Sequence, residues 1–198
     1  MNRWIFVRHG ESQLNVRNRT ERVYCGQYDT PLTARGRRQA VAAARTLSRW
    51  SGVRVTTAVS SPLARCRETL AVMLDELPYA VDWLPPDRRI SERSLGAFEG
   101  LLEPVARRQY PRYFEDPALR GFDQHFSLRV PGGENLADVT ERACEALAAL
   151  SASAAGDILV VSHYTTIRCL LGRLRGLASD AIQQLQVPNA EPICVTRE

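Results

Sequence analysis

The sequence predicts an α/β protein with three layers, α/β/α, built on a mostly parallel central sheet with an inserted loop and helix segment. Strand-like segments alternate with longer segments of helical periodicity, which is typical of this class. The 198 residues, 44% hydrophobic and 24% charged, are enough to bury one core. We expect residues 1–198 to form a single domain, with an excursion at about 101–133 that is rich in proline, arginine and aromatic residues.

Five short segments have the composition of β-strands. They are either continuous apolar runs, as expected for strands buried on both faces, or runs rich in β-branched residues. The expected strands are, in order, residues 4–7, 53–60, 80–84, 157–162 and 193–196. Because helical segments separate most of them, the strands are expected to pair largely in parallel.

Six segments carry helical periodicity or the residues that begin and end helices. One helix follows Thr33 as N-cap and places Ala40, Ala43, Ala44 and Leu47 on one face. The others are expected after Ser61 as cap with Pro62 in the first turn, at 101–109, from Asn135 with Asp138 in its first turn, from Thr165 or Thr166 to about Gly176, and at 179–186.

Polar side chains follow three of the expected strands. Arg8 and His9 end the first strand, Ser60 and Ser61 end the second, and His163 follows the strand at 157–162. In sheets of this class, ligands bind at the carboxyl ends of the strands. Two of the three histidines in the chain are therefore expected at the edge where a ligand would bind.

The charges at this edge point to an anion. Arg65 lies in the first turn of its helix, where the helix dipole disfavours a cation unless an anion binds nearby. Arg8 beside His9 has the same need for a negative partner. Each feature alone has a simpler explanation: a structural histidine, a surface ion pair or a solvated arginine. Their coincidence favours a phosphate pocket.

Composition excludes several function classes. The chain has no lysine, so all 26 of its basic residues are arginine, which excludes Schiff-base and P-loop lysines. The arginines are scattered, so we expect no nucleic-acid surface.

No apolar run is long enough to span a membrane and no signal peptide is evident, so we expect a cytoplasmic protein without membrane contact. The five cysteines suggest no disulfide or zinc pattern; we expect Cys66, Cys169 and Cys194 in the core.

A set of motifs occurs in order along nearly the whole chain: RHGES, GQYDTPLTARGRRQA, SSPLARCRET, SERSLGAFEG, PGGEN and VVSHYTTIR. Together they resemble the histidine phosphatase superfamily, also called the phosphoglycerate mutase-like family. The resemblance implies that His9 is a nucleophile that takes up the phosphoryl group. It also implies that Arg8, Arg65 and His163 surround the phosphate, that Asn15 is a neutral phosphate ligand, and that Glu92 is the general acid. It implies no metal and no other cofactor.

Departures from the mutase pattern favour a phosphatase. By the resemblance, mutases carry a tyrosine where this chain has Leu95 and a lysine in the region of Glu103, and Tyr164 stands where glycine is usual and is expected to narrow the pocket. We therefore expect a metal-independent phosphomonoester hydrolase, a histidine acid-type phosphatase, that acts on a small phosphorylated metabolite. A phosphoglycerate mutase and a non-catalytic phospholigand-binding module remain alternatives.

Substrate selectivity is expected from Cys25, Gly26, Gln27 and Leu95 together with the excursion at 104–130, and Tyr164 is also expected to bind substrate. The aromatic residues of the excursion have two interpretations: they wall the leaving-group site, or they pack the excursion onto the domain. The set is Tyr110, Tyr113, Phe114, Phe122 and Phe126. The oligomeric state is left open, a homodimer included.

Overall fold

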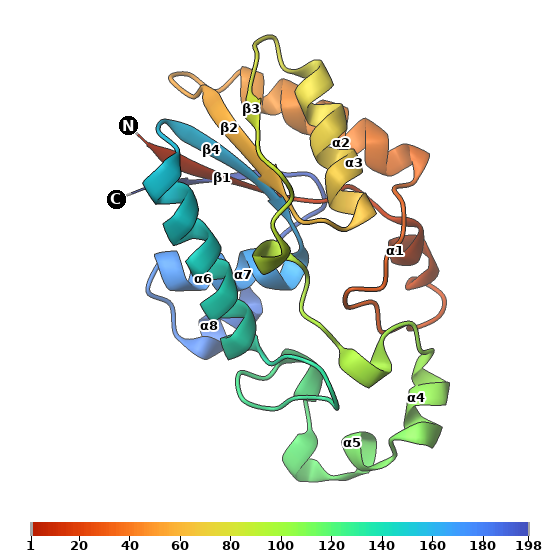
Figure 1. Ribbon diagram of the computed structural model, residues 1–198. Coiled ribbons are helices and arrows are strands. Elements are labelled where there is room, and N and C mark those ends of the chain that lie inside the picture. The colour runs from red at the N-terminus through yellow and green to blue at the C-terminus, as the bar shows by residue number, and fades with distance from the viewer. Residues whose placement is uncertain (1, 198) are drawn as a thin grey trace.

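A computed structural model describes residues 2–197 and contains a five-stranded sheet in the order β3-β2-β4-β1-β5 (Figure 1). The strands are β1 (Arg3–Arg8), β2 (Val55–Ser60), β3 (Asp82–Trp83), β4 (Asp157–Ser162) and β5 (Pro192–Thr196). All neighbouring pairs are parallel except β1 and β5, which are antiparallel. The predicted mostly parallel sheet is therefore confirmed.

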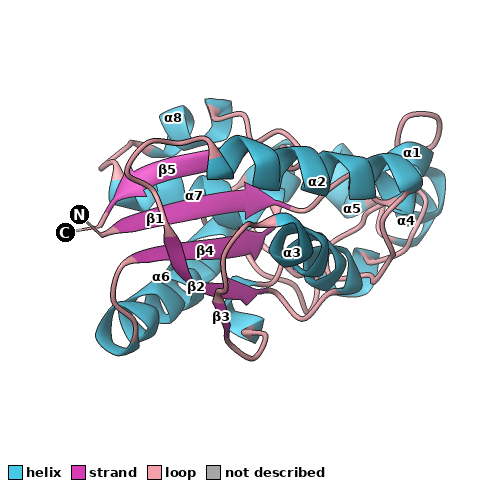
Figure 2. Cartoon of the chain, turned by 90° about the horizontal axis from the view of Figure 1, so that it is seen from above, coloured by secondary structure: helices cyan, strands magenta, loops and turns pink. Residues whose placement is uncertain are grey.

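Helices cover both faces of the sheet. The helices are α1 (Gln13–Arg17), α2 (Ala34–Ser48), α3 (Ala64–Glu76), α4 (Glu103–Gln109), α5 (Arg112–Glu115), α6 (Leu136–Ser153), α7 (Tyr164–Leu174) and α8 (Ser179–Gln184). Helices α2 and α3 lie on one face, and α6, α7 and α8 lie on the other (Figures 1 and 2). This is the predicted α/β/α arrangement, and the predicted strand and helix positions hold to within a few residues.

The alternation of side chains along β1 explains why the sheet needs both helical layers. Ile5 and Val7 pack with α2 and α3, whereas Trp4 and Phe6 pack with α6 and α7. All four side chains are at most 2% exposed. A strand that is apolar at every position is stable only when both of its faces are covered, so the sequence of β1 itself requires three layers.

Two predicted helix starts are confirmed and two are wrong. Thr33 caps α2, and Asn135 caps α6 through reciprocal hydrogen bonds with Asp138. In contrast, α3 begins at Ala64 with Leu63 at the N-cap position, so Ser61 does not cap it. Helix α7 begins at Tyr164, one residue before the predicted start, because His163 takes the N-cap position directly after β4.

The excursion has its own small core. The predicted helix at 101–109 is present as α4, and the expected irregular region also contains α5 and short 3-10 turns. Phe98 and Tyr24 pack there with Tyr110, Tyr113, Phe114 and Phe122, while Phe126 packs near the start of α6. These aromatic residues therefore hold the excursion together and onto the rest of the chain.

Two further expectations can be compared with the structure. Cys66 and Cys169 are buried as predicted, but Cys194 is exposed, because it lies on the edge strand β5. Within residues 2–197, no helix has both the length and the apolar character that crossing a membrane requires.

Candidate active site

The register of β1 and β4 brings the two strand-end histidines together. Arg8 and Ser162 are direct partners in the parallel pair, so His9 and His163 follow side by side at the carboxyl edge. Their ring centroids are 5.3 Å apart with an angle of 63° between the ring planes. Both rings are buried. The sequence-based expectation that these histidines meet at one edge is confirmed.

His9 is held in a single tautomer by its neighbour. Its Nδ1 lies 2.8 Å from the carbonyl oxygen of Gly10, and because a carbonyl only accepts, Nδ1 carries the proton. The lone pair is then on Nε2. Burial and the charges of Arg65 and Arg8 lower the pKa of His9 well below its usual value. The ring is therefore neutral and nucleophilic at physiological pH.

Arg65 lies in the first turn of α3 and is almost fully buried. Its guanidinium donates to the carbonyl oxygens of Tyr28 at 2.9 Å and Gly26 at 3.0 Å, and its Nε donates to His163 Nδ1 at 3.3 Å. Three neutral acceptors fix its orientation without neutralising its charge. The positive charge remains available to an anion in the cavity.

His163 lies behind this arginine. Because Arg65 can only donate, His163 Nδ1 accepts and Nε2 carries the proton, which it donates to Ser61 Oγ at 2.8 Å. Ser61, expected as a helix cap, has this role instead. Burial and the nearby Arg65 lower the pKa of His163 well below its usual value. Its direct contact with phosphate stays a prediction, since both ring nitrogens bond to protein groups.

Arg8 contributes the second cationic group. Its Nη1 donates to the carbonyl oxygen of Val187 at 3.0 Å, and its guanidinium lies over the ring of Tyr164 at 5.0 Å. Tyr164 does not line the cavity. It therefore lies behind Arg8 and does not narrow the pocket, which corrects the expectation drawn from its position after His163.

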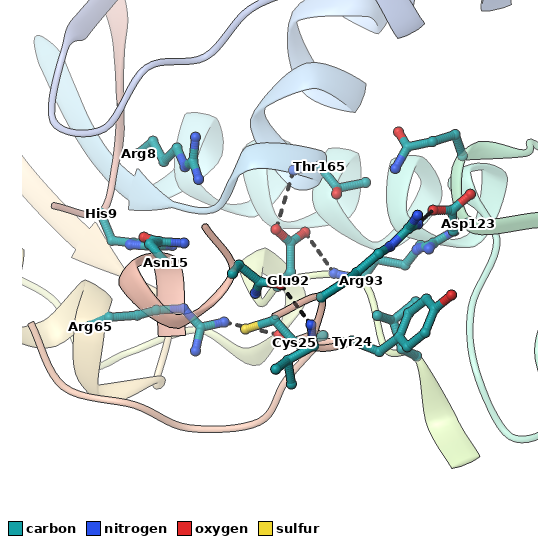
Figure 3. A pocket seen from close by; sticks show the side chains of 16 residues that line it. Arg8, His9, Asn15, Tyr24, Cys25, Arg65, Glu92, Arg93, Asp123 and Thr165 are labelled. Atoms are coloured by element: carbon teal, nitrogen blue, oxygen red, sulfur yellow. Dashed lines mark hydrogen bonds and ion pairs between the residues drawn. The ribbon is translucent and has the colours of Figure 1, made fainter. Parts of the chain in front are cut away.

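Glu92 faces the arginines from the loop after β3. One carboxylate oxygen accepts from the backbone N–H of Arg93 at 2.9 Å, and the other from that of Thr165, in the first turn of α7, at 3.3 Å. The Glu92 carbonyl accepts from Gln27 Nε2 at 2.9 Å and from Arg142 at 3.1 Å. Its backbone and side chain are thus both anchored, and its carboxylate lies between the two ends of the cavity (Figure 3).

These groups line a cavity of about 240 Å³. Eight of the predicted site residues contribute to its wall: Arg8, His9, Asn15, Cys25, Gly26, Arg65, Glu92 and Leu95. Gln27, His163 and Tyr164 do not line the cavity. They contact Glu92, Arg65 and Arg8 respectively, which do line it. Burial raises the pKa of Cys25 to about 11, so its thiol stays neutral in the wall.

Asn15 is placed by a helix that sequence analysis did not identify. Ser12 caps the short helix α1, and Asn15 Oδ1 accepts from the Ser12 backbone N–H at 3.0 Å. The amide oxygen is therefore occupied while the amide nitrogen remains a donor for an anion. The Ser-x-x-Asn spacing is a variant of the capping box and could have revealed this helix.

The far end of the cavity is formed by residues that sequence analysis missed. Arg93 and Asp123 lie there, opposite Arg8 and Arg65 (Figure 3). Arg22 pairs with Asp123 at 2.6 Å and joins the loop after α1 to the excursion. The remaining members of the wall are Asn18, Val23, Tyr24, Gln124 and Thr165. Arg93 had a signal in its position next to Glu92, and Thr165 lies in the first turn of α7; most of the others come from irregular segments without periodicity.

Within residues 2–197, no group of three or more His, Cys, Asp and Glu side chains is arranged to hold a metal ion. The cavity wall near the sheet edge instead combines Arg8 and Arg65 with the imidazole of His9 and the carboxylate of Glu92. This donor set suits an anionic ligand, because the arginines would repel a cation.

Comparison with known proteins agrees with this geometry. A 2,3-bisphosphoglycerate-dependent phosphoglycerate mutase of Methylobacterium radiotolerans is 32% identical over 192 residues, which cover 96% of this chain and 86% of the relative. A mycobacterial glucosyl-3-phosphoglycerate phosphatase, solved with VO3, superposes with a TM-score of 0.78 at 28% identity, covering 99% and 93% of the two chains.

The α-ribazole phosphatase from Shigella flexneri shares the fold, with a TM-score of 0.77 at 24% identity over 99% of this chain and 91% of that one. Phosphoryl-transfer enzymes of both kinds, a mutase and phosphatases, are thus among the similar proteins. Residues 4–198 match the sequence model of one family. The chain belongs to the histidine phosphatase superfamily, branch 1.

Proposed function

We propose that this protein is a metal-independent phosphomonoesterase that hydrolyses a small phosphorylated metabolite through a phosphohistidine on His9. One observation carries the proposal: the neutral His9, with its free lone pair on Nε2, lines one cavity with Arg8, Arg65 and the carboxylate of Glu92. Nucleophile, cationic groups and acid are the parts that such a reaction needs.

In the first step, His9 Nε2 attacks phosphorus in line with the ester oxygen. The N–P bond forms as the P–O bond breaks, and protonated Glu92 gives its proton to the departing alcohol oxygen. Arg8 and Arg65 stabilise the negative charge on the equatorial oxygens. The hydrogen bond from His9 Nδ1 to the Gly10 carbonyl keeps the ring oriented as Nε2 becomes bonded to phosphorus.

In the second step, water enters the position left by the alcohol. The Glu92 carboxylate takes a proton from this water, whose oxygen attacks phosphorus while the N–P bond breaks. Inorganic phosphate leaves, and both Glu92 and His9 return to their starting protonation states. Glu92 suits both steps because its anchored carboxylate lies between the phosphate end and the far end of the cavity.

The cavity supports a small, polar leaving group. Its volume of about 240 Å³ matches a metabolite of modest size, and its far end presents Arg93, Asp123 and Gln124. The aromatic residues of the excursion pack with one another and with Tyr24 and Phe98. Of this aromatic cluster, Tyr24 lines the cavity. The similarity to a phosphoglycerate mutase and to a glucosyl-3-phosphoglycerate phosphatase also supports a phosphorylated small metabolite.

Mutase activity is the second candidate, because a phosphoglycerate mutase is 32% identical to this chain. Against it, Leu95 lines the cavity where the mutase pattern has tyrosine. Glu103, in the region where mutases have lysine, pairs with Arg22 and Arg107 and does not line the cavity. We therefore favour hydrolysis.

Turnover of p-nitrophenyl phosphate in EDTA tests the proposal. Wild-type activity that His9→Ala abolishes, together with trapping of a phosphorylated His9 under acid-free quenching, is the expected result. A parallel assay with 3-phosphoglycerate and catalytic 2,3-bisphosphoglycerate distinguishes a mutase. Phosphate binding without turnover would instead indicate a binding module, and an absolute metal requirement would contradict the proposal.

A further inference from the structure

Two guanidinium groups lie over the ring of Tyr164. Arg8 is centred 5.0 Å from the ring centroid and Arg168 is 4.9 Å from it. The Tyr164 hydroxyl donates to the carbonyl oxygen of Leu185 at 3.3 Å, which fixes the ring by its edge. Tyr164 is the first residue of α7 and therefore directly follows His163.

Both arginines have a buried N–H that finds no acceptor among residues 2–197. These atoms are Nε of Arg8 and Nη2 of Arg168. A buried donor without a partner is unfavourable. The negative face of an aromatic ring attracts a cation. The ring of Tyr164 therefore partly offsets the cost of the N–H groups that have no acceptor.

Arg8 depends on this contact more than the other phosphate-site arginine does. Arg65 donates three hydrogen bonds to fixed acceptors, whereas Arg8 donates one, from Nη1 to the carbonyl of Val187. Without the ring, the guanidinium of Arg8 could rotate about its single anchor. Arg168 cannot replace the ring, because it is itself a cation and has no acceptor for the Arg8 N–H groups; its own hydrogen bonds go to the Ile182 carbonyl and to Gln124.

We propose that Tyr164 is a positioning residue whose ring face holds Arg8 in the orientation that binds phosphate. The residue does not line the cavity, so it acts through Arg8 and does not touch the substrate. Arg168 also lies over the ring, and its bond to Gln124 connects this cluster to the wall of the cavity. The inference rests on the proposed function only in taking Arg8 as a phosphate-binding group.

A graded series of rings at position 164 tests the inference. Tyr164→Phe removes the hydroxyl and is the reference; 4-fluoro- and 3,4,5-trifluorophenylalanine, introduced at the same codon, then weaken the ring face with little change of shape. The dissociation constant of inorganic phosphate is measured by calorimetry. The same series at Tyr79, whose ring faces Arg54 outside the cavity lining, is the matched control.

We expect the dissociation constant to rise stepwise with fluorination, to roughly 3- to 10-fold above that of the phenylalanine variant. The Tyr79 series should leave it unchanged. Tyr164→Leu should weaken phosphate binding further. The thermal unfolding midpoints of the fluorinated proteins should stay near that of the phenylalanine variant. A dissociation constant that does not vary across the fluorinated series would overturn the inference, because a purely packing role depends on shape alone.

The two proposals fail in different ways. The calorimetric series needs no turnover, so a protein that hydrolyses nothing but shows graded phosphate binding would support Tyr164 as a positioning residue and refute the hydrolase. An active phosphatase with a flat series would refute only the role of Tyr164.

Discussion

Arg65 and His163 are joined by a buried hydrogen bond of 3.3 Å in which the arginine Nε donates to the imidazole Nδ1. The bond fixes the tautomer of the histidine, because a guanidinium has no acceptor. His163 thus contacts Arg65 through this bond and also lies beside the ring of His9. Arg65 is therefore oriented by a neutral ring, which leaves its charge available to an anion.

This bond predicts a difference between two substitutions. His163→Asn retains an acceptor near the position of Nδ1, whereas His163→Ala leaves Arg65 Nε without one. We expect the asparagine variant to keep phosphate affinity within about 10-fold of wild type and the alanine variant to lose roughly 10- to 100-fold. Equal losses in phosphate affinity, measured by calorimetry, would mean that the ring itself contacts phosphate.

The two buried histidines predict how stability depends on pH. Burial and Arg65 lower the pKa of both rings below the value of 6.5 that they have in an unfolded chain. Below that pH the unfolded chain binds up to two more protons than the native protein. The free energy of unfolding should therefore fall as pH decreases through 6.5, by up to about 2.7 kcal/mol per pH unit.

Urea denaturation between about pH 7.5 and 5.5 checks this slope. His9→Gln should reduce it to about half, because one of the two rings is removed, and saturating phosphate should also reduce it by pairing with a protonated ring. Glu11, Asp87 and Asp138, whose pKa values are lowered, act on stability only at more acidic pH, below their usual values of 4.5 and 3.8. A stability independent of pH in this window would contradict the buried, neutral state of the rings.

Replacement of Glu92 should depend on the leaving group. Glu92→Gln keeps the size of the side chain but removes the proton donor. An alkyl alcohol leaves poorly without protonation, so we expect hydrolysis of alkyl phosphates to slow about 100- to 10,000-fold. The rate with p-nitrophenyl phosphate, whose phenolate is a good leaving group, should fall much less. The ratio of kcat values for the two substrates is the measurement, and equal losses would argue against Glu92 as the acid.

The carbonyl oxygen of Gly26 accepts a hydrogen bond from Arg65 and so connects the loop before α2 to the cavity. The φ of Gly26 is +46°, and a Cβ there would lie 2.7 Å from a carboxylate oxygen of Glu99, which also bonds to the Gln27 and Leu95 backbone. Gly26→Ala should displace the carbonyl that accepts from Arg65. We expect kcat/KM to fall roughly 10-fold or more.

Gly121→Ala is the matched control for this substitution. Gly121 also has a positive φ, of 74°, but a Cβ there meets no atom within 4 Å. It should therefore cost about 1 kcal/mol of stability through backbone strain alone and leave kcat/KM near wild type. Similar kinetic losses in both variants would mean that strain, and not the Arg65 contact, causes the effect.

The ion pair between Arg22 and Asp123 predicts leaving-group selectivity. Asp123→Asn removes a negative charge from the cavity wall and frees the Arg22 guanidinium that it now holds at 2.6 Å. Substrates that carry a second anionic group should then show a KM lower by about 3- to 10-fold, whereas neutral aryl phosphates should be unaffected. Glu103→Gln removes the other partner of Arg22, which lies outside this wall, and should have a smaller effect.

The sequence predicted the sheet and the phosphate end of the site because both depend on local signals. A largely apolar run such as 157–162 predicts a buried strand, and the residue after such a strand then lies at the sheet edge. His9 and His163 were predicted in this way, whereas Arg65 was predicted from its place in the first turn of a helix. The details that required spatial neighbours were not found: Ser61 bonds to His163 across 102 positions, and α3 begins three residues after it, at Ala64.

The far end of the cavity could not be predicted for the same reason. Asp123 and Gln124 reach the wall because the aromatic cluster around Phe98 and Phe122 folds the excursion back toward α1. No periodicity marks such a segment, and its proline and arginine content describes only an irregular region. The motifs around Glu92 indicated the acid but not its contacts with Thr165 and Gln27.

Because the excursion has a hydrophobic cluster of its own, the two ends of the cavity are built on separate supports. The sheet edge holds the reacting groups, and the segment with α4 and α5 (green in Figure 1) holds part of the opposite wall. The segment could therefore be exchanged for that of a relative while Arg8, His9 and Arg65 keep their support at the sheet edge. We expect such an exchange to change which leaving groups the cavity accepts, because Asp123 and Gln124 would be replaced.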